Sequence, residues 1–133
     1  MGELRPADRK RRGLLWVPAG AVAIIIFVLS SIPGPAFPQI RFPLADKVVH
    51  ALIYAVLAVC LAIPLHRIRV QFGWGRVIAA ATVLAGLYGV TDEFHQRFTP
   101  FRSSDPWDVV ADTLGALVGG VAFAAVMRGT KKG

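Results

Sequence analysis

The chain has one cysteine, few acidic residues and little charge overall. With Cys60 as its only thiol, it can form neither a disulfide nor a cysteine cluster around a metal within one molecule. Charged residues make up 17% of the 133 residues, whereas about 25% is usual in soluble domains. Hydrophobic residues reach 55% and the mean hydropathy is +0.57. This balance excludes an ordinary soluble domain and indicates a membrane protein.

Established catalytic signatures are also missing from the sequence. It contains no Ser-Gly-His phosphatase motif and no paired-carboxylate prenyl signature. No internal repeat is present either. The sequence therefore locates a candidate site better than it names a reaction.

Four apolar segments are long enough to cross a bilayer, a task that takes roughly 20 helical residues. They cover residues 14–32, 46–65, 76–94 and 107–127. The first could be a signal peptide, but its apolar run is longer than the usual h-region, which favours an uncleaved anchor. We predict an all-α integral membrane four-helix bundle over residues 14–127, with basic tails at residues 1–13 and 128–133.

The cations predict the orientation of this bundle. Eleven of the 15 Lys and Arg residues lie in the two tails and around the loop between the second and third segments. Because Lys and Arg in short loops stay on the cytoplasmic side, both termini are predicted to be cytoplasmic. The loops at residues 33–45 and 95–106 then face outward, and four prolines should hold the first of them over the bundle. Nucleic-acid binding is disfavoured, since the basic residues are split among short flanks.

Ionisable residues gather at the outer ends of the segments, where polar groups beside hydrocarbon usually mark a functional site. Asp46, His50 and Tyr54 are four residues apart, so they share one face of a helix that descends about 12 Å from the surface. Lys47 follows the first of them. His50 could bind a ligand, or its ring could simply be satisfied by a tyrosine or by a carboxylate on another helix.

The third segment ends in a second polar group. Glu93 lies one turn beyond Gly89, where a partner helix can approach closely, so it should point inward. Asp92 and His95 are expected to be solvated at the helix end. In the following loop, Ser104 or Asp105 before a proline is typical of a helix N-cap.

Arg102 and the fourth segment carry the remaining ionisable residues of the candidate site. The planar guanidinium of Arg102 suits a carboxylate or a phosphate, or it pairs with Glu93 or Asp108. On the last segment Asp108, Asp112, Gly115 and Gly119 recur at helical spacing. Asp112 lies a full turn inside the membrane boundary. The two glycines form a close-packing motif that predicts either a helix contact or a homo-oligomer.

In this order, the polar residues resemble the pattern of the VanZ-like family over residues 45–120. The matching positions are Asp46, Lys47, His50, Tyr54, Glu93, Gln96, Arg102, Asp105, Asp108, Asp112 and Gly115. The family often has Asn where Asp112 stands. The resemblance implies a small multi-pass protein of the bacterial inner membrane. Its named member is linked to low-level resistance to teicoplanin, a lipid-tailed glycopeptide antibiotic.

Two functions follow from the residues. In the first, an outer pocket binds a membrane lipid or a lipid-linked cell-wall intermediate by its anionic headgroup, which would affect the cell envelope; the family resemblance adds an effect on teicoplanin resistance. The binding residues would be Asp46, Lys47, Tyr54, Gln96, Arg102, Ser104, Asp105 and Asp112.

In the second, the chain is a membrane enzyme acting on a phospholipid or a polyprenyl phosphate. His50, Glu93 and Asp108 would be catalytic, with His50 as nucleophile or general acid and base. A variant of this hypothesis places a divalent cation among His50 and the carboxylates of Glu93, Asp108 and Asp112. Transport is disfavoured because the inner halves of the segments are almost wholly apolar.

Overall fold

The chain is a bundle of long helices, described here from a computed structural model that covers residues 5–36, 44–69 and 71–130. Its elements are α1 (Pro6–Leu14), α2 (Val17–Ser30), the short 3-10 helix η1 (Gly34–Ala36), α3 (Ala45–Ile68), α4 (Trp74–Gln96) and α5 (Pro106–Gly129). Every regular element in these ranges is helical. Four helical stretches are long and apolar enough to cross a membrane, the first being α1 and α2 taken together as Ala7–Ser30. The predicted all-α, four-span architecture is confirmed.

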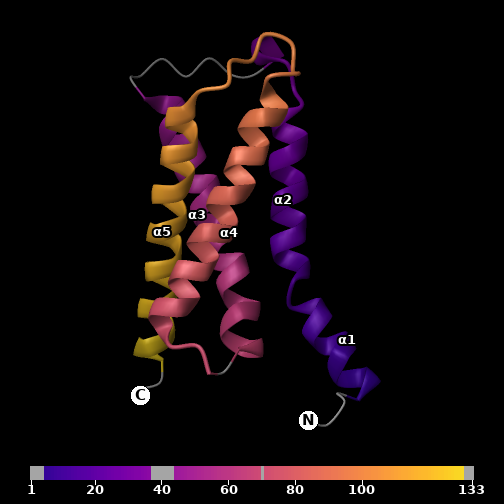
Figure 1. The fold of residues 1–133 in the computed structure, drawn as a ribbon, viewed down its shortest axis with the longest axis vertical. Helices are drawn as coiled ribbons and strands as arrows, with labels where there is room; N and C mark the ends of the chain where they lie inside the picture. The colour runs from indigo at the N-terminus through magenta and orange to yellow at the C-terminus, as the bar shows by residue number, and fades with distance from the viewer. Residues whose placement is uncertain (1–4, 37–43, 70, 131–133) are drawn as a thin grey trace.

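The first stretch is divided by a bend at Leu15 and Trp16. Pro18 lies in the first turn of α2 and has no backbone N–H to donate to the carbonyl of Leu14, so one continuous helix would lose a hydrogen bond there. Figure 1 shows α1 turned away from the bundle below α2. The basic residues before α2 therefore lie largely on a helix of their own.

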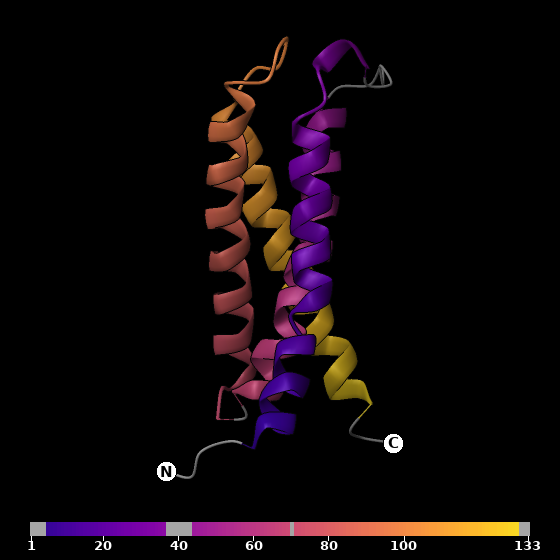
Figure 2. The same cartoon turned by 90° about the vertical axis from the view of Figure 1, so that its right-hand side faces the viewer.

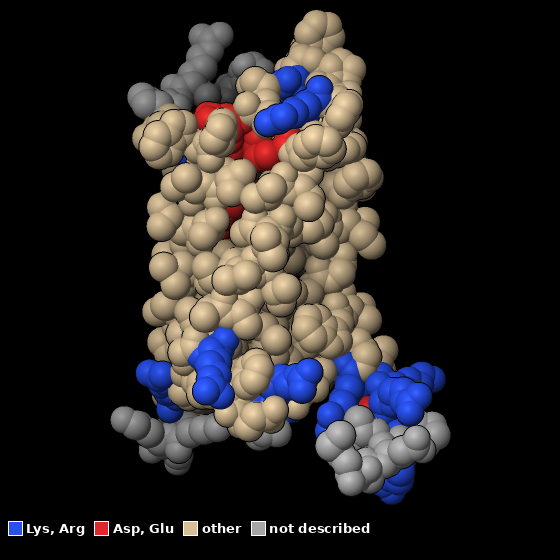
Figure 3. All heavy atoms as spheres, in the orientation of Figure 1, with Lys and Arg blue, Asp and Glu red and all other residues tan. Residues whose placement is uncertain are grey.

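The two ends of the bundle differ in charge. Both termini lie at one end, which we term the terminal end, together with the connection between α3 and α4 (Figures 1 and 2). The opposite end, the loop end, carries the connections from α2 to α3 and from α4 to α5. In Figure 3 the lower, terminal end bears most of the visible Lys and Arg, and most of the visible acidic surface lies toward the loop end. Residues 37–43, including Pro38 and Pro43 of the predicted cover, lie outside the described residues.

Packing is tightest among α3, α4 and α5, while α2 contacts α3 and α4 less extensively. A side chain at Gly115 or Gly119 would overlap the backbone of α3 at Ala51 or Ala55. The glycines thus allow α5 to lie directly on α3, as their spacing predicted. A contact between copies through the same two glycines would require α3 to move away, and it stays a prediction.

Small side chains fill the interior of the bundle. Ala58, Ala62, Ala81, Ala85 and Ala116 are fully buried. Large aliphatic and aromatic side chains instead cover the outside of the helices. This distribution suits hydrocarbon as the surrounding solvent, because close helix contacts in membranes depend on small residues.

Candidate functional site

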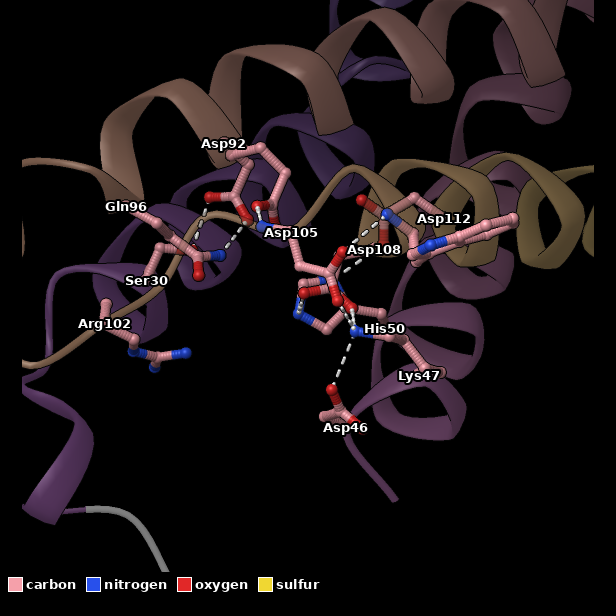
Figure 4. A network of polar contacts seen from close by, with 12 residues as sticks. Ser30, Asp46, Lys47, His50, Asp92, Gln96, Arg102, Asp105, Asp108 and Asp112 are labelled. Atoms are coloured by element: carbon pink, nitrogen blue, oxygen red, sulfur yellow. Dashed lines mark hydrogen bonds and ion pairs between the residues drawn. The ribbon is translucent and has the colours of Figure 1, made fainter. Parts of the chain in front are cut away.

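The polar residues at the loop end meet around Lys47 (Figure 4). Its Nζ donates hydrogen bonds to Asp105 Oδ2 and Asp108 Oδ1, both at 2.6 Å, and to Asp46 Oδ2 at 2.9 Å. Asp46 and Lys47 lie in the first turn of α3, and the other two carboxylates belong to the N-cap and the first turn of α5. Three carboxylates thus surround one partly buried ammonium and join the starts of α3 and α5.

Asp105 is the N-cap of α5, as predicted. One of its carboxylate oxygens accepts from the backbone N–H of Trp107 at 3.0 Å, and Pro106 occupies the first turn. The hydrogen bonds from Lys47 and from that amide hold the pKa of the Asp105 carboxyl below its ordinary value. The residue therefore has a structural role beside any role in a ligand site.

His50 lies one turn deeper and pairs with α5. Its Nδ1 is 2.9 Å from Asp112 Oδ1, and its Nε2 faces Asp108 Oδ2 at 4.0 Å. Asp112 is fully buried. A Cβ atom at Gly89 would come within 2.7 Å of Asp112 Oδ2, so this glycine gives the carboxylate its space. The ring is satisfied by a carboxylate on another helix, one of the alternatives drawn from the sequence.

Glu93 extends the same group from α4. Its Oε2 accepts the backbone N–H of Asp105 at 2.8 Å, which ties α4 to the start of α5. The other oxygen, Oε1, is buried and has no hydrogen-bond partner in the described part of the chain. The side chain is 4% exposed, so the inward orientation predicted for Glu93 is confirmed. Ser104 lines a cleft beside it.

A second polar group joins α2 to α4. The hydroxyl of Ser30 donates to Asp92 Oδ1, and Gln96 Nε2 donates to Asp92 Oδ2 at 3.0 Å. The Thr99 hydroxyl donates to the carbonyl oxygen of Ser30 at 3.0 Å. The expectation that Asp92 is solvated is wrong, because it is 5% exposed and paired across the helix interface.

His95 is likewise not simply solvated. Its ring lies 4.6 Å from the ring of Phe27, centroid to centroid, and its Nε2 is 3.0 Å from the hydroxyl oxygen of Ser31. Ser30, Ser31 and Thr99 also form the site but were not predicted. A hydroxyl at the end of the first apolar run marks the two serines, and Thr99 carries no such signal.

Arg102 secures the end of α2. Its Nε donates to the carbonyl of Ile32 at 3.2 Å and its Nη2 to the carbonyl of Leu29 at 3.0 Å. Cations are favourable at a helix C-terminus, where carbonyls lack helical partners. The predicted ion pairs of Arg102 to Glu93 or Asp108 stay predictions.

Between the two polar groups lies a cavity of about 80 Å³ at the junction of α2, α3 and α4. Its lining includes Ile26, Leu29, Ser30, Val49, His50, Ile53, Tyr54, Asp92, Gln96 and Arg102. Tyr54 is 1% exposed, and its hydroxyl has no hydrogen-bond partner within the described ranges. The cavity therefore combines an apolar wall with polar groups able to orient a ligand.

An apolar groove continues along the same interface toward the terminal end. It is lined by Trp16, Ala19, Gly20 and Ala23 of α2 and its approach, by Leu57 and Leu61 of α3, and by Leu84 and Tyr88 of α4. Tyr88 donates its hydroxyl to the carbonyl of Ala23 at 2.6 Å, and its ring lies 6.4 Å from that of Tyr54. The two tyrosines thus stand between the polar cavity and the groove.

The structure brings most of the predicted site residues together, but in two groups. One contains Asp46, Lys47, His50, Glu93, Asp105, Asp108 and Asp112. The cavity side has Gln96, Arg102 and Tyr54, with His50 at the boundary. Lys47 Nζ contacts three carboxylates of the first group, and Arg102 is the cation that lines the cavity.

Four apolar spans around buried ionisable groups define a multi-pass helical membrane protein with an internal polar site. The model of the VanZ/LLP1 family matches residues 7–127, and the chain belongs to this family. No curated protein and no solved structure matches the chain.

Proposed function

We propose that the protein binds an amphiphile with an anionic headgroup, such as a lipid-linked cell-wall intermediate, at the interface between α2 and α3–α4. The cavity beside Arg102 and His50 receives the headgroup, and the groove below it receives the apolar chain. The supporting observation is that a polar cavity and an apolar groove follow one another along one interface. Such an order matches the two chemical halves of a lipid.

Arg102 and His50 are the groups that would meet the charge. Arg102 lies at the cavity with a fork geometry suited to phosphate or carboxylate. The unpartnered hydroxyl of Tyr54 supplies a donor at the base of the same cavity. Binding there would alter the supply of envelope precursors or access of a lipid-tailed glycopeptide such as teicoplanin, which is the physiological effect we propose.

The loop end is proposed to face away from the cytoplasm of a bacterial inner membrane. The support is the concentration of cations at the terminal end (Figure 3). In a Cys60→Ser background, Ser103→Cys should react with a membrane-impermeant maleimide on intact spheroplasts, and Gly129→Cys should react only after lysis. The reverse pattern would overturn the orientation.

Lipid retention tests the binding proposal directly. Ile53 lines the cavity, whereas the adjacent Leu52 is 63% exposed on the outside of α3. Native mass spectrometry of the detergent-purified protein should show a phosphorylated lipid adduct. Ile53→Phe should remove it, and Leu52→Phe should keep it. Equal retention in both variants would contradict the site.

Catalysis on a phospholipid or a polyprenyl phosphate is the second candidate. It is favoured by the contact of His50 Nδ1 with Asp112 Oδ1 at 2.9 Å, since a carboxylate that orients an imidazole prepares it for proton transfer. Glu93 and Asp108 lie on its other side. Incubation of the purified protein with the co-purified lipid decides the matter: release of phosphate that disappears in His50→Gln supports an enzyme, and an unchanged lipid supports a binder.

A further inference from the structure

Three side chains at the loop end are arranged as ligands around a common point. His50 of α3, Glu93 of α4 and Asp108 of α5 each offer one nitrogen or oxygen atom, and these atoms lie within 4.8 Å of one another. Each residue comes from a different helix. A cation at this point would therefore connect the three tightly packed helices.

The orientation of His50 fits metal binding. With Nδ1 directed at Asp112 Oδ1, 2.9 Å away, its Nε2 faces Asp108 Oδ2 at 4.0 Å. That separation is too long for a hydrogen bond, and metal–ligand bonds of about 2.0–2.2 Å from each side would span it. Histidine ligands almost always direct their second nitrogen at a carboxylate, a carbonyl or a water. The carboxylate of Asp112 is such a partner for the second nitrogen of His50.

A second, independent observation comes from Glu93. Its Oε2 is held by the Asp105 amide, yet its Oε1 is buried and lacks a hydrogen-bond partner within the described residues. The side chain is 4% exposed. A buried carboxylate oxygen without a donor is costly, and a cation would satisfy it.

The local charge points the same way. Lys47 contacts three carboxylates, which include Asp108, and within the described ranges neither Glu93 nor Asp112 is among its ion-pair partners. Carboxylates therefore outnumber ammonium groups around His50. Excess negative charge next to hydrocarbon is unfavourable, so a bound cation would stabilise these carboxylates.

We propose that His50, Glu93 and Asp108 bind a divalent transition-metal cation such as Mn²⁺ or Zn²⁺, with Asp112 as the residue that positions His50. One imidazole and two carboxylates form a mixed nitrogen and oxygen donor set that suits these ions. The site lies beside the cavity and does not depend on a lipid being bound. A bound cation would also give an anionic headgroup a positive neighbour.

Binding of Mn²⁺ alone to the purified full-length protein in detergent tests this site. Electron paramagnetic resonance should detect one bound Mn²⁺ per chain, with nitrogen coupling from His50 in the pulsed spectrum. Glu93→Gln and His50→Gln should each weaken binding at least about tenfold, and His50→Gln should abolish the nitrogen coupling. Asp46→Asn is the matched control, since Asp46 lies outside the three ligands, and it should bind Mn²⁺ like the unmodified chain.

Asp112→Asn separates positioning from ligation. Loss of an outer carboxylate usually weakens metal binding by about 10–100-fold. Nitrogen coupling should persist in this variant at saturating Mn²⁺, because His50 remains a ligand. Persistence of full affinity in Asp112→Asn would overturn the positioning role.

Three outcomes would overturn the metal site: no saturable Mn²⁺ binding, bound Mn²⁺ without nitrogen coupling, or equal weakening by Asp46→Asn and Glu93→Gln. Size-exclusion chromatography shows which variants fold. If a ligand variant does not fold, the stoichiometry of Mn²⁺ binding and the nitrogen coupling measured on the unmodified chain test the site. Ile53→Phe should lose the lipid while still binding Mn²⁺. That variant makes failure of the lipid proposal distinguishable from failure of the metal site.

Discussion

Two interfaces of the bundle differ in how closely they are packed. The closed interface lies between α3 and α5, and the open interface lies between α2 and the pair of α3 and α4. The first is closed by backbone contacts at Gly115 and Gly119 and by the ion pairs of Lys47. The second holds fewer contacts, a cavity and an apolar groove. One side of the bundle is therefore closely packed, and the other is the side at which we propose that a ligand binds.

The largest expected effect comes from filling a glycine contact in the closed interface. A side chain at Gly115 would overlap the backbone of Ala51, which cannot move without displacing α3. Gly115→Leu should therefore cost about 3 kcal/mol or more and give little folded protein. Expression and thermal melting in detergent measure the loss.

The matched change on the open side is Gly20→Leu, because a Cβ atom at Gly20 meets nothing within 4 Å. This variant should fold normally and retain less lipid, since Gly20 lines the groove. If Gly20→Leu destabilised the protein as much as Gly115→Leu, the contrast between the two interfaces would be lost.

Lys47→Met should have the next largest effect. It leaves Asp46, Asp105 and Asp108 without their shared ammonium, and removal of one partner from a buried ion pair costs about 3–5 kcal/mol. Because Lys47 keeps partial solvent contact, we expect about 3 kcal/mol, read from the melting temperature. Lys10→Met, on α1, is the control and should leave the melting temperature unchanged.

Ser30→Ala should have a smaller effect, confined to the open interface. It removes the donor to one oxygen of Asp92 and leaves the bond from Gln96 in place, so a loss of about 1–2 kcal/mol is expected. The exposed Ser103 provides the control, Ser103→Ala. A change in melting temperature equal to that of Lys47→Met would mean that both interfaces carry similar polar energies.

Asp105 should show the smallest effect, visible only in acid. Its pKa lies below the ordinary value because of Lys47 and the Trp107 amide. The stability that it contributes is thus present above its unfolded pKa of about 3.9 and is lost as the pH falls through the lower folded pKa. Asp105→Asn should flatten the decline in melting temperature below about pH 4, and an unchanged profile would contradict the ion pair.

Spacing along single helices predicted much of the fold and of the first polar group. Four apolar lengths predicted the spans, and the four-residue spacing predicted that Asp46 and His50 share one helix face. In the structure, His50 on that face meets Asp108 and Asp112 of α5. Helical periodicity shows which residues share a face. It does not show which helix that face meets.

The errors share this cause. Asp92 looked like a solvated residue because its partner, Ser30, belongs to the first span. The bonds of Arg102 to two carbonyls were also not predicted, because nothing in the sequence places Arg102 at the end of α2. The contacts of Asp92 and Arg102 both depend on which helices pack against α2 in the folded bundle.

Photo-crosslinking at two matched valines tests most directly whether α2 borders a lipid site. Val49 lines the cavity and is 40% exposed, while Val110 on α5 is 44% exposed away from it. With p-benzoylphenylalanine at Val49, irradiation in native membranes should yield one dominant phosphorylated lipid adduct by mass spectrometry, and the same group at Val110 should yield a mixture of bulk lipids. The same bulk mixture at both positions would contradict a specific site at this interface.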